Sequence, residues 1–126
     1  MNILETYAQI TGEAVIAHLQ QLAAPLQGKQ VLHINSTAVG GGVAEILTRF
    51  VPLMRELGID ATWEVISGDE PFYACTKKMH NGLQGDTVSI SESHLQHYQE
   101  VNAENAAQLR DRLESADFVF IHDPQP

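Results

Sequence analysis

The stretch Val31-Leu-His-Ile-Asn-Ser-Thr-Ala-Val-Gly-Gly-Gly42 decides the predicted fold of this 126-residue chain. Its first five residues form a short β-prone run, and the other seven form a turn rich in glycine. After this turn, apolar residues recur at three- and four-residue steps from Val43 to Leu57, which is the period of an amphipathic helix. The stretch therefore predicts a strand, a tight loop and a helix, in that order.

Comparable patterns predict the remaining elements on either side. Helices are predicted at 11–26, within a helical segment 1–27, and at 72–83 and 91–100, and strands at 59–66 and 118–122. Residues 102–113 are predicted as another helix or as the continuation of the helix before them. Pro52 is expected to kink or split the helix at 43–57, and Gly58 is expected to end it. This order predicts an α/β fold, a Rossmann-like parallel sheet with flanking helices, in a single domain spanning 1–126.

The end of the pattern suggests a shortened domain. Three predicted strands are few for a parallel sheet, and the apolar run Phe118–Ile121 has the composition of a strand covered on both faces. We therefore expect a truncated domain whose last strand exposes an apolar edge. Such edges pair with other chains, so a homo-oligomer, or a missing C-terminal domain that covers the edge, is expected.

Composition excludes several classes of protein. Sixteen acidic and seven basic residues give a formal net charge of −9, which argues against binding to a nucleic-acid backbone. No apolar run is long enough to span a membrane and no signal pattern begins the chain, so a soluble, cytoplasmic protein without membrane contact is expected. Cys75 is the one cysteine, which excludes an intramolecular disulfide and a thiolate zinc site.

The glycine loop, Gly40, Gly41 and Gly42, follows a strand and begins a helix. Free amide groups and the helix dipole attract anions at such a place, although a tight turn that needs positive φ explains the glycines equally well. Val43-Ala44 stands where a P-loop carries Lys-Ser/Thr, and Glu45 stands where the dinucleotide motif carries a small residue. A phosphate or a polar sugar therefore remains as the expected ligand.

His122 and Asp123 end the third predicted strand. Because the carboxyl ends of parallel strands meet at one edge, this pair should face the same crevice as the glycine loop. An imidazole beside the hydroxyls of Ser36 and Thr37 suits sugar hydroxyls, since it both donates and accepts hydrogen bonds. The alternative is that Asp123 caps a following helix and His122 is only a buried strand end.

Weaker candidates lie elsewhere in the chain. Lys77, His80 and Asn81, together with Gln84, share one helical face, which is most often only solvated. His94 and His97 have a spacing that suits a metal but lack a third ligand, so no metal site is predicted. Cys75 lacks an evident base at a diagnostic spacing, which disfavours a nucleophilic role. The strand residue Trp63 is expected in the core.

Four motifs occur in the chain in a fixed order. They are His33-x-Asn35-Ser36-Thr37-x-x-Gly40-Gly41-Gly42-Val43-Ala44-Glu45-Ile46-Leu47, Trp63-x-Val65-Ile66-x-Gly68, Phe72-x-x-x-Thr76-Lys77-x-x-His80-Asn81-x-Leu83-Gln84-Gly85, and His122-Asp123-Pro124-Gln125-Pro126. Taken together, these motifs closely resemble trehalose synthase of the glycosyl-transferring type. The relative of this family is trehalose phosphorylase, and both belong to the retaining glycosyltransferases of family 4. The resemblance runs from about Leu26 to the end of the chain.

The resemblance implies a GT-B architecture, in which two Rossmann-like domains face each other across a cleft. This chain would be part of the N-terminal, acceptor-side domain, and its partners would be a nucleotide sugar and glucose, without a cofactor. By this analogy His122 contacts the sugar at the reaction centre, and Gly41 and Gly42 approach the donor diphosphate or the transferred glucose. The full set of implied substrate-binding residues is Asn35, Ser36, Gly40, Gly41, Gly42, Lys77, His80, Asn81 and Asp123.

The domain that carries the basic residues for the leaving diphosphate is absent from this sequence, so the chain is expected to be inactive alone. The alternative is a stand-alone sugar- or nucleotide-binding module that complements or regulates a separate partner. A small Rossmann-like oxidoreductase domain is a third possibility.

Overall fold

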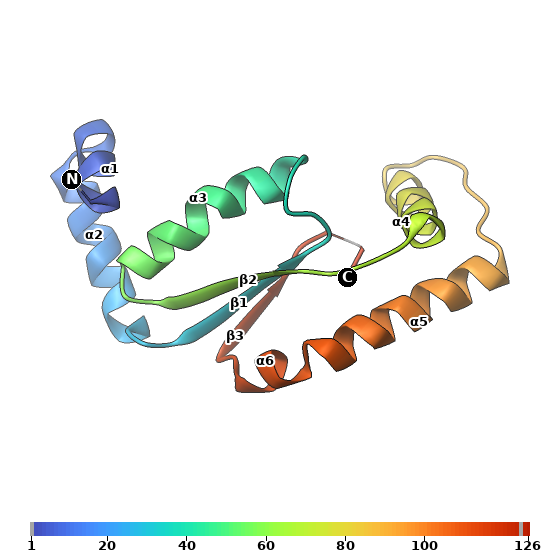
Figure 1. The fold of residues 1–126 in the computed structure, drawn as a ribbon. Helices are drawn as coiled ribbons and strands as arrows, with labels where there is room; N and C mark the ends of the chain where they lie inside the picture. The colour runs from blue at the N-terminus through green and yellow to red at the C-terminus, as the bar shows by residue number, and fades with distance from the viewer. Residues whose placement is uncertain (1, 124) are drawn as a thin grey trace.

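Strand β1 (Gln30–Asn35) is the centre of a three-stranded parallel sheet in the computed structural model, which describes residues 2–123 and 125–126 (Figure 1). β2 (Asp60–Val65) pairs with one side of β1 and β3 (Phe118–Ile121) with the other, so the strand order is β2-β1-β3. In this register His33 lies between Trp63 of β2 and Phe120 of β3. The predicted α/β fold with a parallel sheet is confirmed.

Helices cover both faces of this sheet, as the alternation of residues along β1 requires (Figure 1). Val31 belongs to a core cluster with Leu47, Val51 and Met54 of α3 (Gly42–Glu56). Leu32 and Ile34 belong to the opposite cluster. That cluster includes side chains from α4 (Glu70–Leu83), α5 (Glu92–Gln108) and α6 (Arg110–Ser115). The sheet is therefore the middle layer of three.

The N-terminal segment consists of α1 (Ile3–Thr11), α2 (Glu13–Ala23) and the 3-10 turn η1 (Ala24–Leu26). The single predicted helix at 11–26 is wrong at its start, because Gly12 has a φ of 90° and separates two helices. Asn2 and Glu5 form a capping box that begins α1. This capping signal shows where the missed helix starts.

The other helix boundaries differ from the prediction in informative ways. α3 continues through Pro52 as one helix, so the predicted split does not occur. Its apolar face, packed on the sheet through Leu47, Val51 and Met54, holds the segments before and after the proline in line. The 91–113 region divides at Leu109, between α5 and α6, so the helix that begins after Ser91 continues past residue 102, which is one of the two predicted alternatives. Gly58, with a φ of 89°, follows the end of α3 as expected.

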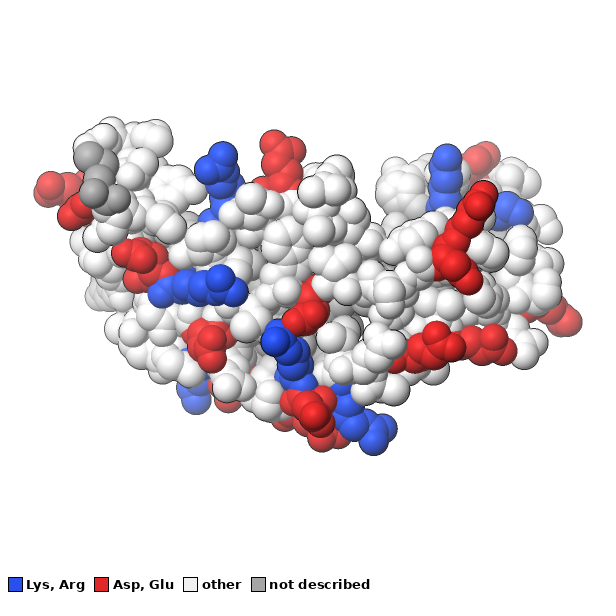
Figure 2. Space-filling view, viewed as in Figure 1, with Lys and Arg blue, Asp and Glu red and all other residues white. Residues whose placement is uncertain are grey.

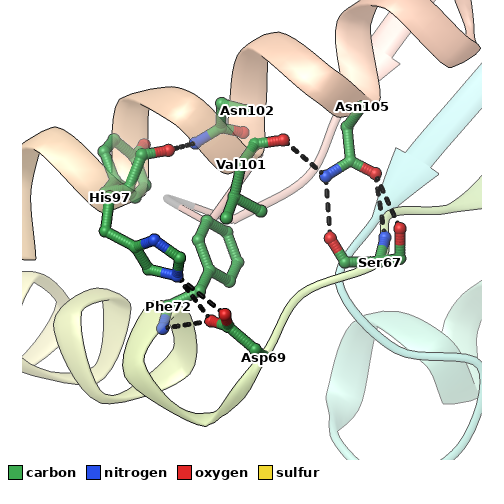
Figure 3. A network of polar contacts seen from close by, with 8 residues as sticks. Ser67, Asp69, Phe72, His97, Val101, Asn102 and Asn105 are labelled. Carbon is green, nitrogen blue, oxygen red and sulfur yellow. Dashed lines mark hydrogen bonds and ion pairs between the residues drawn. The ribbon is translucent and has the colours of Figure 1, made fainter.

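Asn105 joins α5 to the loop that follows β2 (Figure 3). Its side-chain Oδ1 accepts from the backbone N–H of Ser67 at 2.9 Å, and its Nδ2 donates to the Ser67 carbonyl at 2.7 Å. The same Nδ2 donates to the Val101 carbonyl at 2.9 Å. Asn105 is only 7% exposed, so water does not readily replace these bonds. This clamp fixes the position from which α4 begins.

A second contact in Figure 3 holds the start of α4. Asp69 is the N-cap of α4 and accepts from the Phe72 N–H at 2.9 Å. His97 of α5 donates to the Asp69 carboxylate at 2.7 Å. This hydrogen bond raises the pKa of His97, and the same bond, with that from Phe72, lowers the pKa of Asp69. α4 begins two residues earlier than predicted because of this cap.

The strand β3 exposes apolar side chains along its whole length. The exposed fractions of its four residues are 47% for Phe118, 39% for Val119, 48% for Phe120 and 59% for Ile121. β3 is also an edge of the sheet, with β1 as its neighbour on one side only. The apolar edge expected from the sequence is therefore present. Among the described residues, no helix has the length and apolar character needed to cross a membrane.

We expect Asn105→Ala to lower the free energy of unfolding by about 1–3 kcal/mol, because it removes the hydrogen bonds of this buried side chain to the amide and carbonyl of Ser67 and to the carbonyl of Val101. Urea unfolding followed by Trp63 fluorescence measures this change. Gln96→Ala is the matched control on the same helix, since Gln96 donates only to exposed Glu100. Equal stability of the two variants would contradict the clamp.

Candidate functional site

The carboxyl edge of β1 is the place where the chain changes its direction of winding. From β1 the chain crosses to β2 on one side, and it later returns to β3 on the other side. The loops that leave β1 and β3 therefore diverge at this edge, and ligands of open parallel sheets bind in the crevice between such loops. The sequence-based candidates 35–42 and 122–123 both lie at this edge.

The glycine loop leads from β1 into α3 and is exposed. Gly40 and Gly41 have φ values of 74° and 91°, which side chains rarely adopt. Gly41 is the N-cap of α3 and supplies no side-chain cap, so amide groups of the first turn have no capping partner. The loop therefore presents free N–H donors at the positive end of a 15-residue helix.

Gly42 differs from its two neighbours, because the fold itself does not require a glycine there. Helix α2 begins in the same way, with Gly12 at φ 90°, ψ 153° against Gly41 at φ 91°, ψ 156°. Glu13 follows Gly12 without difficulty at the position that corresponds to Gly42. A Cβ on Gly42 would meet nothing within 4 Å. The bare backbone at Gly42 is thus free for a molecule that approaches from outside the chain.

Asn35 is 1% exposed, and both ends of its amide have partners within the chain. Its Nδ2 donates to the Thr37 carbonyl at 2.7 Å, and its Oδ1 accepts from the indole N–H of Trp63 at 2.7 Å. Trp63 also packs against the α3 core cluster, as expected for a strand tryptophan. Asn35 therefore shapes the start of the glycine loop and has no free polar group for a ligand.

A hollow of about 350 Å³ lies between α4 and the segment after β3. Its wall includes Lys77, His80 and Asp123, three of the candidates from the sequence. Asn81 is half-buried and is not part of that wall. Tyr73, Thr76 and Gln125 complete the lining and were missed by sequence reasoning. Positions 73, 76, 77 and 80 share one face of a helix, which is the signal that could have found Tyr73 and Thr76.

A hydrogen bond connects this hollow to the loop that follows β1. The hydroxyl of Tyr73 donates to the carbonyl of Ser36 at 3.1 Å, which ties α4 to the residue that follows β1. Oε1 of Gln125 is buried and has no hydrogen-bond partner among the described residues. The hollow itself combines a cation, an imidazole, hydroxyls and the carboxylate of Asp123, a set that matches a polyhydroxylated ligand.

Asp123 turns the chain away from β3. It has a φ of 67°, the one positive φ among the described residues other than glycine. Aspartate tolerates this left-handed conformation better than most residues. After this turn Asp123 lines the hollow beside α4, whereas His122 packs with His33 on the α3 side. The structure thus separates the His122-Asp123 pair between two faces of the sheet edge.

His122 lies against a buried histidine that sequence reasoning missed. Nδ1 of His33 is 3.0 Å from Nε2 of His122, and the two rings are nearly parallel at 15°. His33 is 1% exposed, and its Nε2 is 3.3 Å from Sδ of Met54 in α3. Burial, and then the neighbouring His122, lower the pKa of His33. A histidine in the middle of an apolar strand was the available signal for this pair.

The geometry gives little support to a metal site, to a catalytic role for Cys75 or to a basic surface patch. Within the described residues, no group of three or more His, Cys, Asp or Glu side chains could hold a metal ion. His97 is engaged with Asp69, as described above. Cys75 is fully buried, and burial raises the pKa of its thiol, which disfavours the thiolate. On the face shown in Figure 2, basic side chains lie singly among acidic ones.

The fold defines a Rossmann-like parallel α/β domain, and the candidate site residues lie at the carboxyl ends of its strands. Within this class, the chain belongs to the family described as "Trehalose synthase, N-terminal domain", whose profile matches residues 33–126. The architecture is consistent with part of the N-terminal domain of a glycosyltransferase, as the resemblance implied.

Several known proteins are similar in sequence to this chain. The chain is 45% identical over 124 residues to a trehalose synthase from Pyrococcus horikoshii, and the match covers 98% of this chain and 29% of that protein. A trehalose synthase from Rubrobacter xylanophilus is 44% identical over 123 residues, or 30% of its length. A trehalose phosphorylase from Pleurotus pulmonarius is 30% identical over 136 residues, or 18% of its length. The chain therefore spans less than a third of these relatives.

The glycine loop gives a prediction that separates backbone strain from ligand contact. Gly41→Val would force a β-branched residue to a φ of 91° and strain the start of α3, whereas Gly42→Val meets open space. We expect Gly42→Val to fold like the wild type and to bind pyrophosphate at least about fivefold more weakly, a loss of about 1 kcal/mol. Isothermal titration measures the binding.

Glu13→Val is the matched control, because it places the same side chain, valine, at the equivalent position of α2. This control should leave pyrophosphate affinity unchanged. If Gly42→Val is folded and binds pyrophosphate as the wild type does, the glycine loop is only a tight turn.

Proposed function

We propose that this chain is the acceptor-side part of an enzyme that transfers glucose from a nucleotide sugar to glucose, with retention of configuration, within a GT-B architecture. The observation that carries the proposal is the 45% identity to a trehalose synthase over 98% of the chain. The gathering of candidate residues at one sheet edge supports it. The proposal keeps the cytoplasmic location expected from the sequence.

In this proposal the hollow beside α4 binds the acceptor glucose. Lys77 donates to sugar hydroxyls, Asp123 accepts from them, and His80 can do either, so the three residues discriminate hydroxyl positions. The hydroxyl of Tyr73 is already used on Ser36 and holds the wall of the hollow in place. Asn81 contributes from beside the hollow, Ser36 holds Tyr73 through its carbonyl, and Asn35 shapes the start of the glycine loop.

The glycine loop has the donor role. The uncapped first turn of α3 offers N–H groups to the diphosphate or to the transferred glucose, and the bare backbone at Gly42 permits close approach. His122 contacts the sugar at the reaction centre from the opposite side of the crevice. Its contact with buried His33 holds the ring in one orientation, as positioned groups in active sites require.

Departure of a nucleoside diphosphate also requires neutralisation of its charge by positioned cations and amides. The chain carries 7 basic residues against 16 acidic ones, and Lys77 is the cation that lines the proposed acceptor hollow. We therefore propose that the cations at the diphosphate come from the remainder of the enzyme, and that the chain alone does not transfer glucose.

The test is a chimera in which this chain replaces the matching 124 residues of the Pyrococcus horikoshii trehalose synthase. We expect the chimera to form trehalose from a glucose nucleotide and glucose, while the 126-residue chain alone forms none. His122→Ala in the chimera should lower kcat at least about a hundredfold, in the range found when a positioned active-site group is removed. His18→Ala is the matched control, since His18 is exposed on α2.

A folded chimera that forms no trehalose would contradict the proposal. If that chimera still binds glucose in the hollow, the stand-alone binding module is the better description. Full activity of His122→Ala would remove His122 from the reaction centre and leave the rest of the assignment to be tested at Lys77 and Asp123.

We further propose that isolated copies of the chain associate through β3, with the Phe118–Pro126 segments at or near the contact. The exposed apolar side chains of this edge strand support the proposal, because unpaired apolar edges add strands from other chains. We expect sedimentation at micromolar concentration to show dimers or larger oligomers, and Ile121→Lys to shift them to monomer. Ile10→Lys is the control, since Ile10 is 77% exposed on α1. A concentration-independent monomer would contradict the association.

A further inference from the structure

Two histidines and a methionine form a chain of contacts from the core to the proposed reaction centre. Sδ of Met54 lies 3.3 Å from Nε2 of His33, and Nδ1 of His33 lies 3.0 Å from Nε2 of His122. His33 is 1% exposed and Met54 is 8% exposed, whereas His122 is half-buried at the sheet edge. His33, in the middle of this chain of contacts, is therefore the most buried of the three residues.

Only one arrangement of protons on the two imidazoles makes both of these contacts hydrogen bonds. A thioether sulfur can accept a hydrogen bond but has no proton to donate. A neutral imidazole has one N–H and one lone pair on its two nitrogens. The contact with Met54 is therefore a hydrogen bond only if Nε2 of His33 carries the proton, and Nδ1 of His33 is then an acceptor.

The same logic continues to the second histidine. Because Nδ1 of His33 can only accept, the nitrogen that faces it, Nε2 of His122, must carry a proton and donate it. A neutral His122 then has its lone pair on Nδ1. This nitrogen is the one left for a ligand, since Nε2 is engaged with His33.

The packing around His33 keeps it neutral and in place. The ring of Phe120 stacks on it at 5.1 Å and 18°, and the ring of Phe50 meets it edge-on at 5.8 Å and 65°. These apolar rings and the sulfur provide no counter-charge for an imidazolium, so a charged His33 is disfavoured. The lowered pKa of His33 agrees with this environment.

The geometry points to His33 as a positioning residue that, with Met54, sets the tautomer of His122 and makes His122 Nδ1 the acceptor for a sugar hydroxyl. The hydroxyl as ligand rests on the proposed function, whereas the tautomer follows from the three side chains alone. In this arrangement Met54 determines the proton on His33, and His33 determines the proton on His122. A buried strand residue and a helix residue thereby define the hydrogen-bonding character of an edge residue.

Long-range proton–nitrogen NMR of the uniformly labelled chain tests this inference without any sugar or any transfer. At about pH 7.5 we expect His33 and His122 both to show a protonated Nε2 and an unprotonated Nδ1. The chain has six histidines, so His122→Ala assigns the signals of His122, and His33→Gln assigns those of His33 in the same way. The opposite pair, Nδ1–H on His33 with an unprotonated Nε2 on His122, would overturn the inference.

Two variants test the direction of control. Met54→Leu keeps the volume but removes the acceptor, and it should convert the single tautomer of His33 and of His122 into a mixture. Met79→Leu on α4 is the matched control and should leave both unchanged. In His122→Ala, His33 should keep its proton on Nε2, because Met54 remains. Loss of that preference, or unchanged signals in a folded Met54→Leu, would show that Met54 does not set the tautomer.

Because these spectra are recorded on the free chain, failure of the tautomer and failure of glucose transfer are separate results. An inactive chimera with the expected tautomers leaves the positioning role of His33 intact. An active chimera with the opposite tautomers removes it.

Discussion

The structure depends on the burial of one strand on both of its faces. From Val31 to Asn35 every side chain of β1 is buried, so each face needs its own layer of helices and each edge needs its own neighbouring strand. Parallel neighbours on both sides require two crossovers in opposite directions along the sheet, the first from β1 to β2 and the second from β2 past β1 to β3. The loops that leave β1 and β3 therefore diverge at the carboxyl edge of β1, and the candidate site lies there because of this topology.

Two of those five buried side chains are polar, and both are paired. Burial of a polar side chain without a partner costs free energy, so His33 and Asn35 are stable only because Met54, His122, Thr37 and Trp63 supply their hydrogen bonds. The partners lie in the loop after β1, on β2, on α3 and after β3. Polar groups in the core therefore connect the elements of the site to one another, in addition to shaping their own surroundings.

The order of strands and helices could be predicted because periodicity and glycine turns are local signals, as in the stretch from Val31 to Leu57. The division of the N-terminal helix at Gly12 was missed, since a glycine within a helical pattern does not reveal its φ. The contact between His33 and His122 joins residues 89 positions apart, and no local pattern contains the strand register that creates it. The sequence predicted only half of the residues that line the hollow beside α4. Helical spacing grouped Lys77 with His80, and Asp123 was predicted separately as the end of a strand. No local pattern showed that the three line one hollow.

The central claim is that ligands bind at the carboxyl edge of β1. Amide NMR shifts of the labelled chain, recorded as glucose is added, test it most directly. The account predicts changes confined to the segments 36–42, 73–80 and 122–125. A second hollow of about 150 Å³ lies at the opposite, amino edge, between Gln30, Asp60 and Arg112. Shifts that concentrate around those three residues, with none at the carboxyl edge, would contradict the account.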